Sequence, residues 1–372
     1  MSNKFIEIVP ITYTGSMGLS QTEDYFYTPL VFAKELGLKP EVVSTSEIGV
    51  QIDVSKKGVQ NQKFKTHYIT NWVKYFKYLF KNNKEIIYSN SRVPKSLIAG
   101  LFGKYNIFIS HHANLPIKFW QRMIFRFFAN RFDAIRVCNP YEKTELIRLG
   151  VKKKIIHLIP LVVDHEFYSK KVIDSVQTKT KKKYGLKKRD IVLVYLANIR
   201  SLKRMDTVLK ALKKLNDESN NKNYKLLVCG KDFLYQEKLK SVKQMTEEMG
   251  LKDYVIETGW LSFEEIRNVL SVANINVYSS IREGQCLGVY ESAAAGLPQC
   301  LSTIGSFTSV FSESALFHHP DDWNRLAKNI KYYSNNKKTV KKHISTNKKI
   351  VSETCDYEKI RFQLKDLIKK GL

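Results

Sequence analysis

Three features that would each point to a class of protein are missing from this 372-residue sequence. Its five cysteines are odd in number and scattered, with no Cys-x-x-Cys pair, which argues against a disulfide framework and a zinc site. No apolar run reaches the roughly 18 to 20 residues of a membrane span, and the start, MSNKFIEIVP, carries no charged leader before an apolar stretch. We therefore expect a cytoplasmic protein with reduced, mostly buried thiols.

Acidic residues are also scarce, with 35 Asp and Glu against 62 Lys and Arg, for a net charge of +27. Such an excess suits nucleic acid, anionic lipid or a phosphorylated substrate as partner. No helix-turn-helix, zinc-finger or RNA-recognition signature is present, which disfavours nucleic acid. A general richness in Lys, Asn and Ile offers a purely compositional explanation, and the excess is spread over both halves of the chain.

Short apolar runs of strand length alternate with longer periodic segments along the chain. In the first half we predict strands at 5–9, 41–44, 85–88, 107–110, 134–137 and 155–159, with helices at about 23–36, 117–130 and 141–149. In the second half we predict strands at 191–196, 225–228, 254–257, 275–278 and 299–301, helices at about 205–215, 235–249, 262–272 and 289–295, and a helical tail after 321. This alternation is typical of α/β domains built on parallel sheets.

The length fits two domains better than one core. A lysine-rich, weakly apolar stretch at 169–189 interrupts the alternation and is the predicted linker; the alternative is a solvated surface segment within one domain. The predicted domains are 1–168 and 190–355, with a C-terminal helix at about 356–372 as a candidate to pack back on the first. Two doubly wound sheets facing a cleft would bind ligands at the carboxyl ends of their strands.

The sharpest local motif is SSIREGQCLGVYE at 279–291, which follows a strand and enters a helix. Glu283 falls in the loop, where a carboxylate can accept hydrogen bonds from sugar hydroxyls. The backbone amides of 284–288 suit an anion near a helix N-terminus, and Glu291, one turn into the helix, suits a ribose diol. The structural alternative is a capping charge plus a solvated helix carboxylate.

Together with its surroundings, this motif resembles the retaining glycosyltransferases of the GT-B fold, specifically glycosyltransferase family 4. The resemblance includes LANIRSLKRMD at 196–206, Val228-Cys229-Gly230 and the segment 283–298, and more weakly Ser110-His111-His112, 133–150 and 159–164. It covers nearly the whole chain. It implies two Rossmann-like domains, the N-terminal one binding an acceptor and the C-terminal one a nucleotide sugar.

Residue by residue, the resemblance implies that Glu283 contacts the donor sugar, Glu291 the ribose and Lys203 the diphosphate. A cation is needed there because cleavage of the anomeric bond leaves a nucleoside diphosphate whose growing charge must be stabilised; the alternative for Lys203 is a plain surface lysine. Further donor contacts are implied for Gly284, Gln285, Cys286, Leu287 and Asn198.

The sequence departs from the family pattern at three places in this half. Ala197-Asn198 stands where the family commonly has Gly-Arg, Arg204 stands for a glycine after the lysine, and Cys286 stands for a glycine after Gln285. Arg200 is the candidate to supply the missing guanidinium, ranked below Lys203. Because glycine permits a close backbone approach, the Cys286 departure bears on how the donor is contacted.

In the first half, the loop TGSMG at 14–18 resembles the family's small-residue loop that faces donor phosphate and acceptor, which makes Gly15 and Ser16 donor-site candidates. His112 aligns with the family histidine near the reacting sugar, and His111 is the alternative because the pair blurs the register. The structural alternative for either is a histidine that satisfies hydrogen bonds at a strand end.

Two segments mix aromatic and basic residues at helical spacing, 118–132 and 72–84. Basic amphipathic helices of this kind bind anionic lipid surfaces. The alternative is that they are crossover helices whose aromatic side chains pack in the core, and both interpretations stay open. Trp260 after a strand is likewise either a nucleobase platform or ordinary packing.

The resulting hypothesis is a retaining glycosyltransferase that moves a sugar from a nucleoside-diphosphate donor, UDP- or GDP-linked, to a saccharide or lipid-linked saccharide acceptor. The resemblance implies retention and needs no Asp-x-Asp metal motif, so we predict no cofactor and no divalent ion, and a cytoplasmic enzyme peripheral to the inner face of the membrane. The alternatives are a nucleotide-sugar epimerase or hydrolase on the same scaffold, and a basic nucleic-acid-binding protein.

Overall fold

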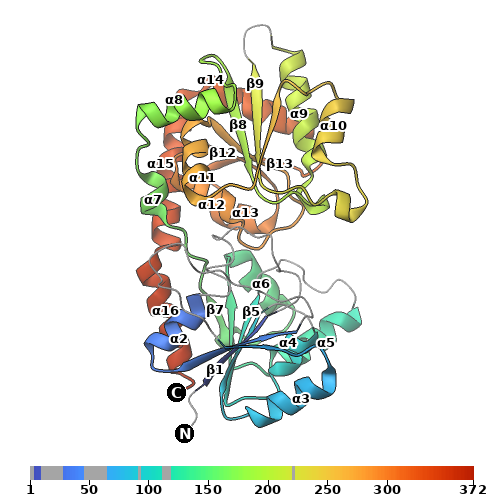
Figure 1. The fold of residues 1–372 in the computed structure, drawn as a ribbon, viewed down its shortest axis with the longest axis vertical. Coiled ribbons are helices and arrows are strands. Elements are labelled where there is room, and N and C mark those ends of the chain that lie inside the picture. The colour runs from blue at the N-terminus through green and yellow to red at the C-terminus, as the bar shows by residue number, and fades with distance from the viewer. Residues whose placement is uncertain (1–3, 10–27, 46–64, 91–93, 111–118, 220–222) are drawn as a thin grey trace. The chain divides into compact units, whose positions relative to one another are not determined.

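A computed structural model describes residues 4–9, 28–45, 65–90, 94–110, 119–219 and 223–372 (Figure 1). The chain forms two compact units. Unit 1 comprises Met1–Val162 together with Tyr357–Leu372, and unit 2 comprises Val163–Asp356. Each unit is an α/β domain with a parallel sheet, as the alternation in the sequence predicts.

Unit 1 is built on a seven-stranded sheet in the order β3-β2-β1-β4-β5-β6-β7, in which neighbouring strands run parallel. Its strands are β1 (Lys4–Val9), β2 (Lys39–Ser44), β3 (Lys65–Tyr68), β4 (Ile86–Asn90), β5 (Tyr105–Ser110), β6 (Ala134–Val137) and β7 (Ile156–Leu158). Its helices are α2 (Thr28–Glu35), α3 (Trp72–Lys81), α4 (Pro94–Ala99), α5 (Phe119–Ala129), α6 (Pro140–Arg148) and α16 (Tyr357–Lys369), with the 3-10 turn η3 at Lys153–Ile155.

The core of unit 1 lies on both faces of its sheet, because successive strand residues point to opposite sides. Phe5 and Tyr88 pack on one face with α2 and α16, whereas Ile6 and Ile87 pack on the other with α3 and α4. Burial on both faces explains why these strands read as continuous apolar runs. The position of α16 agrees with the prediction that the C-terminal helix packs back on the first domain.

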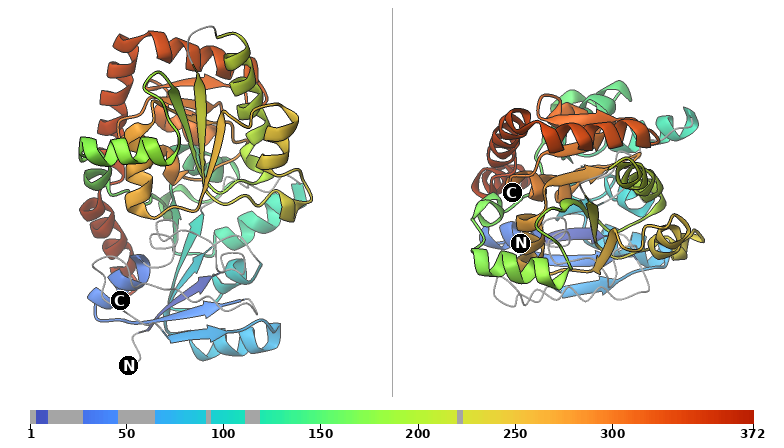
Figure 2. Two further views of the ribbon diagram at one scale, coloured as in Figure 1. Left: turned by 45° about the horizontal axis from the view of Figure 1, so that its top comes forward. Right: turned by 90° about the horizontal axis from the view of Figure 1, so that it is seen from above.

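Unit 2 is built on a six-stranded parallel sheet in the order β10-β9-β8-β11-β12-β13. Its strands are β8 (Ile191–Leu196), β9 (Tyr224–Cys229), β10 (Val255–Gly259), β11 (Ile275–Tyr278), β12 (Gln299–Ser302) and β13 (Ala315–His318). Its helices are α7 (His165–Ser169), α8 (Asp174–Lys183), α9 (Met205–Asp217), α10 (Val242–Glu248), α11 (Phe263–Val272), α12 (Leu287–Ala294), α13 (Gly305–Phe311), α14 (Trp323–Asn335) and α15 (Lys337–Thr354), with 3-10 turns η4 (Ser201–Lys203) and η5 (Tyr235–Glu237). Helices α9 and α14 pack together on the sheet, while α12 packs against β8 and β11 (Figure 2).

The six strands of unit 2 follow the same order as the first six of unit 1, and in both sheets the order reverses beside the first strand. In unit 2 the reversal lies between β8 and β11, so the loops that leave the carboxyl ends of these two strands diverge there. Open α/β sheets bind ligands at such a point. The corresponding loops of unit 1, after β1, β4 and β5, fall outside the described residues.

The stretch at 169–189, predicted as a linker, lies within unit 2 and contains α8. Its lysines are exposed, while Val172 and Thr180 are buried and α8 packs on α11. Lys183 also pairs with Glu265 on α11, with Nζ and Oε1 3.3 Å apart. Packing on α11 therefore places this helix in unit 2, and the boundary between units falls at 162/163 and 356/357 instead.

Other differences concern short elements. The strands β3 and β13 and the helix α13 were not predicted, because each is a short element of only 4 to 7 residues. The helix α3 falls on the segment 72–84, whose spacing predicted a helix. The helix predicted at 235–249 is instead η5 followed by α10. Lys238 adopts a left-handed backbone at φ 58°, which interrupts the helix. The next helix, α10, begins after Ser241, which forms a capping box with Gln244.

Candidate functional site

The candidate site of unit 2 starts with the loop that follows β8. The buried Tyr195 on β8 donates its hydroxyl to the backbone carbonyl of Lys203 at 2.9 Å, and the amide of Ile281 donates to the carbonyl of Leu202 at 2.9 Å. The first bond fixes the lysine's backbone to its own strand. The second fixes it to the loop after β11, so the two loops at the reversal of strand order are joined.

These two loops bring Lys203 and Glu283 together. Lys203 Nζ lies 2.5 Å from Glu283 Oε1, and the side chains are 17% and 11% exposed. Burial lowers the pKa of the Lys203 ammonium, but the Glu283 carboxylate outweighs burial, so the net shift is upward. Lys203 therefore holds a permanent positive charge with only a little water around it.

The residue after the lysine, Arg204, adopts a left-handed backbone at φ 48° and ψ 51°. This conformation favours glycine, which is the residue that the family has here. The Arg204 guanidinium compensates by binding Asp206 at 3.0 and 3.1 Å and by pairing with Asp321 after β13. The departure from the family pattern thus keeps the backbone shape and adds two ion pairs.

The two other predicted residues of this loop turn to the segment after β9. Arg200 pairs with Glu237 at 3.5 Å and lies over the ring of Phe233 at 4.8 Å. Asn198 accepts a hydrogen bond from the amide of Lys231 at 3.0 Å. Both side chains bind residues of the loop after β9, and neither is hydrogen-bonded or ion-paired to Lys203 or Glu283 in the described contacts.

The start of α12 is shaped by close packing. Gly288 lies against the carbonyl of Leu196, where a Cβ atom would clash. Cys286, at the N-cap, is buried and has φ −76°, which any residue adopts, so this backbone has no need of the family's glycine. Burial, reinforced by the Glu283 carboxylate, raises the pKa of the Cys286 thiol to about 12. The buried Gln285 amide reaches Cys355 Sγ at 3.4 Å.

Glu291 lies inside α12, whose residues are all buried. The hydroxyl of Tyr168 on α7 donates to Glu291 Oε1 at 2.9 Å. Burial, together with the Glu291 carboxylate, raises the pKa of Tyr168. The predicted ribose ligand is thus a buried carboxylate oriented by a tyrosine, not a solvated helix charge.

A buried polar cluster beneath the Glu283 loop escaped the sequence analysis. Ser279 Oγ and His318 Nε2 share a hydrogen bond at 3.0 Å, and Ser302 Oγ donates to the carbonyl of Ser280 at 2.6 Å. Burial lowers the pKa of His318 to about 4, so the ring is neutral near pH 7. These bonds join the carboxyl ends of β11, β12 and β13, where a serine pair at 279–280 was the one signal in the sequence.

In unit 1, the predicted Gly15, Ser16, His111 and His112 lie outside the described residues. The residue before the histidines is described: Ser110 Oγ donates to Glu142 Oε1 at 2.5 Å, and both residues are buried. The amide of Cys138 also reaches Glu142, at 3.5 Å. Glu142 is a buried carboxylate at the carboxyl edge of the sheet that the sequence analysis missed, because it reads as an ordinary first-turn glutamate of α6.

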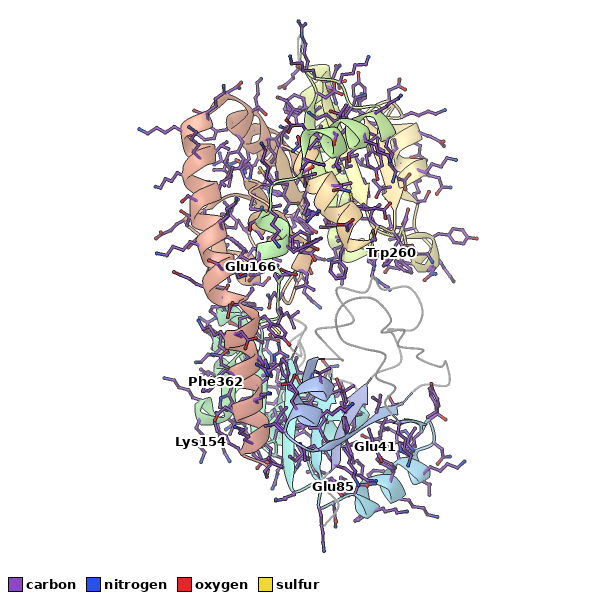
Figure 3. The ribbon with its side chains drawn as sticks, turned by 60° about the vertical axis from the view of Figure 1, so that its left-hand side comes forward. Glu41, Glu85, Lys154, Glu166, Trp260 and Phe362 are labelled. Atoms are coloured by element: carbon purple, nitrogen blue, oxygen red, sulfur yellow. The ribbon has the colours of Figure 1, made fainter. Side chains whose placement is uncertain are left out.

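The remaining expectations concern Trp260, the cysteines, membrane-spanning helices and metal ligands. Trp260 lies on the surface of unit 2 (Figure 3) and is 46% exposed, so it is not ordinary core. All five cysteines are buried, in line with the expectation of mostly buried thiols. Within the described part of the chain, no helix is long and apolar enough to cross a membrane, and no three His, Cys, Asp or Glu side chains converge as metal ligands.

Comparisons with known protein families match both halves of the chain. Residues 176–350 match the model of glycosyl transferases group 1, and residues 30–167 match that of glycosyltransferase family 4. Together the two matches cover most of the sequence.

Among curated proteins, the O-antigen chain mannosyltransferase RfbU of Salmonella typhimurium is 35% identical over 109 residues, which are 28% of this chain and 30% of that protein. The mannosylfructose-phosphate synthase of Agrobacterium fabrum is 26% identical over 196 residues, or 51% of this chain and 42% of the relative. The matches therefore span less than half the length of either relative.

Among solved structures, Anabaena HepE in complex with UDP superposes with a TM-score of 0.80 at 14% identity, over 99% of this chain and 100% of that one. A glycosyltransferase from Rickettsia africae gives 0.79 at 15% identity, over 100% and 98% of the two chains. At these identities the likeness concerns the fold, and it confirms the predicted GT-B fold.

Proposed function

Because this chain belongs to the group 1 glycosyltransferases of family 4, we propose that it transfers a sugar from a nucleoside-diphosphate donor to an acceptor hydroxyl, with retention of anomeric configuration. The observation that carries the proposal is the Lys203–Glu283 pair, 2.5 Å apart where the strand order of unit 2 reverses. Such a point is where doubly wound sheets bind nucleotides.

The pair supplies the two kinds of group that the reaction requires. Departure of a nucleoside diphosphate builds negative charge on its outer phosphate, and the Lys203 ammonium is positioned to stabilise it. Glu283 is then released from the lysine to accept hydrogen bonds from sugar hydroxyls. Glu291, oriented by Tyr168, accepts hydrogen bonds from the ribose hydroxyls.

For the chemical step we propose displacement on one face of the sugar. The bond from the anomeric carbon to the phosphate oxygen breaks, the acceptor oxygen bonds to the same face, and the acceptor proton passes to the departing phosphate. The products are the glycoside and a nucleoside diphosphate. Since Lys203 provides the positive charge, we propose that no divalent ion and no cofactor are required.

The donor proposed is UDP- or GDP-linked. The GT-B relative HepE has been solved with UDP and with UDP-glucose, which supports the uridine form. The acceptor proposed is a saccharide or a lipid-linked saccharide, as suits a chain similar to an O-antigen mannosyltransferase.

We also propose that unit 1 works at the cytoplasmic face of an anionic membrane. Support comes from α3 and α5, which combine lysine or arginine with exposed aromatics: Trp72 and Phe80 on α3, Trp120 and Phe127 on α5. Such helices bind lipid by apolar burial and charge attraction together.

A donor screen tests the central proposal. UDP or GDP should raise the thermal unfolding midpoint, because a ligand that binds only the folded state stabilises it. The matching nucleotide sugar, incubated with a saccharide acceptor, should then give a glycoside of unchanged anomeric configuration by NMR. No stabilisation by any nucleoside diphosphate would contradict the proposal, and a rearranged or free sugar formed without acceptor would replace it by an epimerase or a hydrolase.

A further inference from the structure

A pocket of about 480 Å³ opens beside the C-terminal end of α5 in unit 1. It is lined by Met123, Arg126, Phe127, Asn130, Arg131 and Lys152. Because α5 runs from the end of β5 back to the start of β6, its C-terminal end lies at the amino edge of the sheet. The pocket is therefore separate from the carboxyl edge, where the sheet would bind a substrate of the transfer.

The two arginine side chains of this pocket each pack against a neighbour. The Arg126 guanidinium lies over Gly150, where an added Cβ would come within 2.7 Å of its Nε. The Arg131 guanidinium stacks on the Phe127 ring, 4.7 Å from its centroid. Such packing fixes both guanidinium groups beside the same opening.

The third cation, Lys152, is positioned through its backbone. Asn130 Nδ2 donates to the carbonyl of Gly150 at 3.0 Å, and Asn130 Oδ1 accepts from the amide of Lys152 at 2.9 Å. Across the described residues, no carboxylate forms an ion pair with Arg126, Arg131 or Lys152. The pocket thus gathers three positive charges that no acidic side chain of the described chain neutralises.

An apolar stripe continues from the pocket along α5. Phe119, Trp120, Met123, Ile124 and Phe127 are each at least 49% exposed. Their spacing places them on one face of the helix, and α5 contains no acidic residue. Met123 and Phe127 belong to both features, so the stripe and the cationic pocket form one continuous surface.

We propose that this pocket binds the phosphate of an anionic phospholipid headgroup while the stripe lies in the acyl boundary of the bilayer. The inference rests on the proposed membrane contact of unit 1 and assigns its specific site. A guanidinium group can donate two parallel hydrogen bonds to two oxygens of one phosphate. Two arginines and a lysine around one opening therefore suit a phosphate group. A soluble phosphate would use the cations alone, whereas a lipid also uses the exposed stripe.

Sedimentation with phosphatidylcholine vesicles, with and without phosphatidylglycerol, tests the site. The wild-type chain should bind the anionic vesicles, and the triple variant Arg126→Gln/Arg131→Gln/Lys152→Gln should bind them on the order of a hundredfold more weakly, at about fivefold per cation. The matched control removes three exposed lysines of α8, as Lys179→Gln/Lys181→Gln/Lys182→Gln. It should bind nearly as the wild type does; equal losses in both triples would show bulk charge attraction and overturn the site.

A second variant tests the lipid against other phosphates. Trp120→Ser/Ile124→Ser keeps the cations and should weaken vesicle binding, whereas unchanged binding would overturn the role of the stripe. Inorganic phosphate binding that the pocket triple abolishes, without vesicle binding, would assign the pocket to a soluble anion and overturn the lipid. Stabilisation by UDP or GDP, measured on the same variants, reports the donor site separately, so failure of either proposal is recognised by itself.

Discussion

Each unit holds a carboxylate at the carboxyl edge of its sheet, and the two are held in different ways. In unit 1, Glu142 is bound by the neutral hydroxyl of Ser110 at 2.5 Å. In unit 2, Glu283 is bound by the ammonium of Lys203 at the same distance. The two also follow different strands: Glu142 comes after β6, whereas Glu283 comes after β11, at the reversal of strand order in unit 2.

The difference separates a carboxylate that is fixed from one that can exchange its partner. A hydroxyl offers Glu142 one hydrogen bond and has no charge to offer an incoming anion. The Lys203 ammonium can leave Glu283 for a phosphate, since either partner satisfies its charge. Our proposal therefore gives Glu142 a structural role and the Lys203–Glu283 pair a role in the reaction. The first two of the four experiments below test this contrast, and the other two test unit 2 alone.

The largest effect is expected from Lys203→Met. Turnover should fall about 10² to 10³-fold, because the variant cannot stabilise the leaving diphosphate. Initial rates of nucleoside-diphosphate release measure it. Lys203→Met also leaves the Glu283 carboxylate without its cation, which should lower the stability of the fold. The double variant Lys203→Met/Glu283→Gln should regain that stability but should remain inactive. Near-normal rates in the single variant would remove Lys203 from the reaction.

Next in size is the loss of the hydroxyl in unit 1. Ser110→Ala should lower the free energy of unfolding by about 1.5 to 3 kcal/mol, since it deprives a buried carboxylate of a charged hydrogen bond. The control in unit 2 is Ser302→Ala, equally buried but bonded to a neutral carbonyl at 2.6 Å, with an expected loss of about 1 kcal/mol. Urea unfolding compares them, and equal losses would mean that Glu142 does not depend on Ser110.

The pH dependence of unit 2 follows from His318. Its pKa is lowered from 6.5 to about 4 in the fold, so the unfolded chain binds the extra proton first as the pH falls. Stability is fully present above about pH 6.5 and declines toward pH 4, by about 2 kcal/mol between about pH 7.5 and pH 5. Thermal unfolding of His318→Gln should lack this part of the slope, whereas His319→Gln, an exposed neighbour, should keep it.

The smallest effect concerns the backbone of Arg204. Because its left-handed conformation suits glycine, Arg204→Gly should be about 1 kcal/mol more stable than Arg204→Ala. Both variants lose the ion pairs with Asp206 and Asp321, so the comparison isolates the backbone. If alanine were as stable as glycine in urea unfolding, φ at this position would differ from 48°.

Much of unit 2 was predictable from its sequence. The strands 191–196 and 275–278 were placed to the residue because a buried parallel strand is a continuous apolar run between turn signals. The helix predicted at about 262–272 agrees with α11, whose start is set locally by a capping box between Ser262 and Glu265. The loops that carry Lys203 and Glu283 could be singled out because each follows such a strand.

The attachment of α8 was not predictable in this way. Its sequence DSVQTKTKKK is mostly charged or polar, and it packs on α11, where Glu265 lies 82 residues after Lys183. The Ser279–His318 bond likewise joins residues 39 positions apart. Contacts at such separations leave no periodic trace in the sequence.

By itself, then, the sequence determined the α/β class, most of the strands and the position of the SSIREGQCLGVYE motif, because these depend on neighbours along the chain. Tertiary structure alone decided that Lys203 meets Glu283 while Arg200 turns to Glu237, and that Tyr168 reaches Glu291. Partner choice of this kind is set by which strand ends lie side by side. At the reversal of strand order in unit 2, the strand ends that meet bring together Lys203 and Glu283 from positions 80 residues apart.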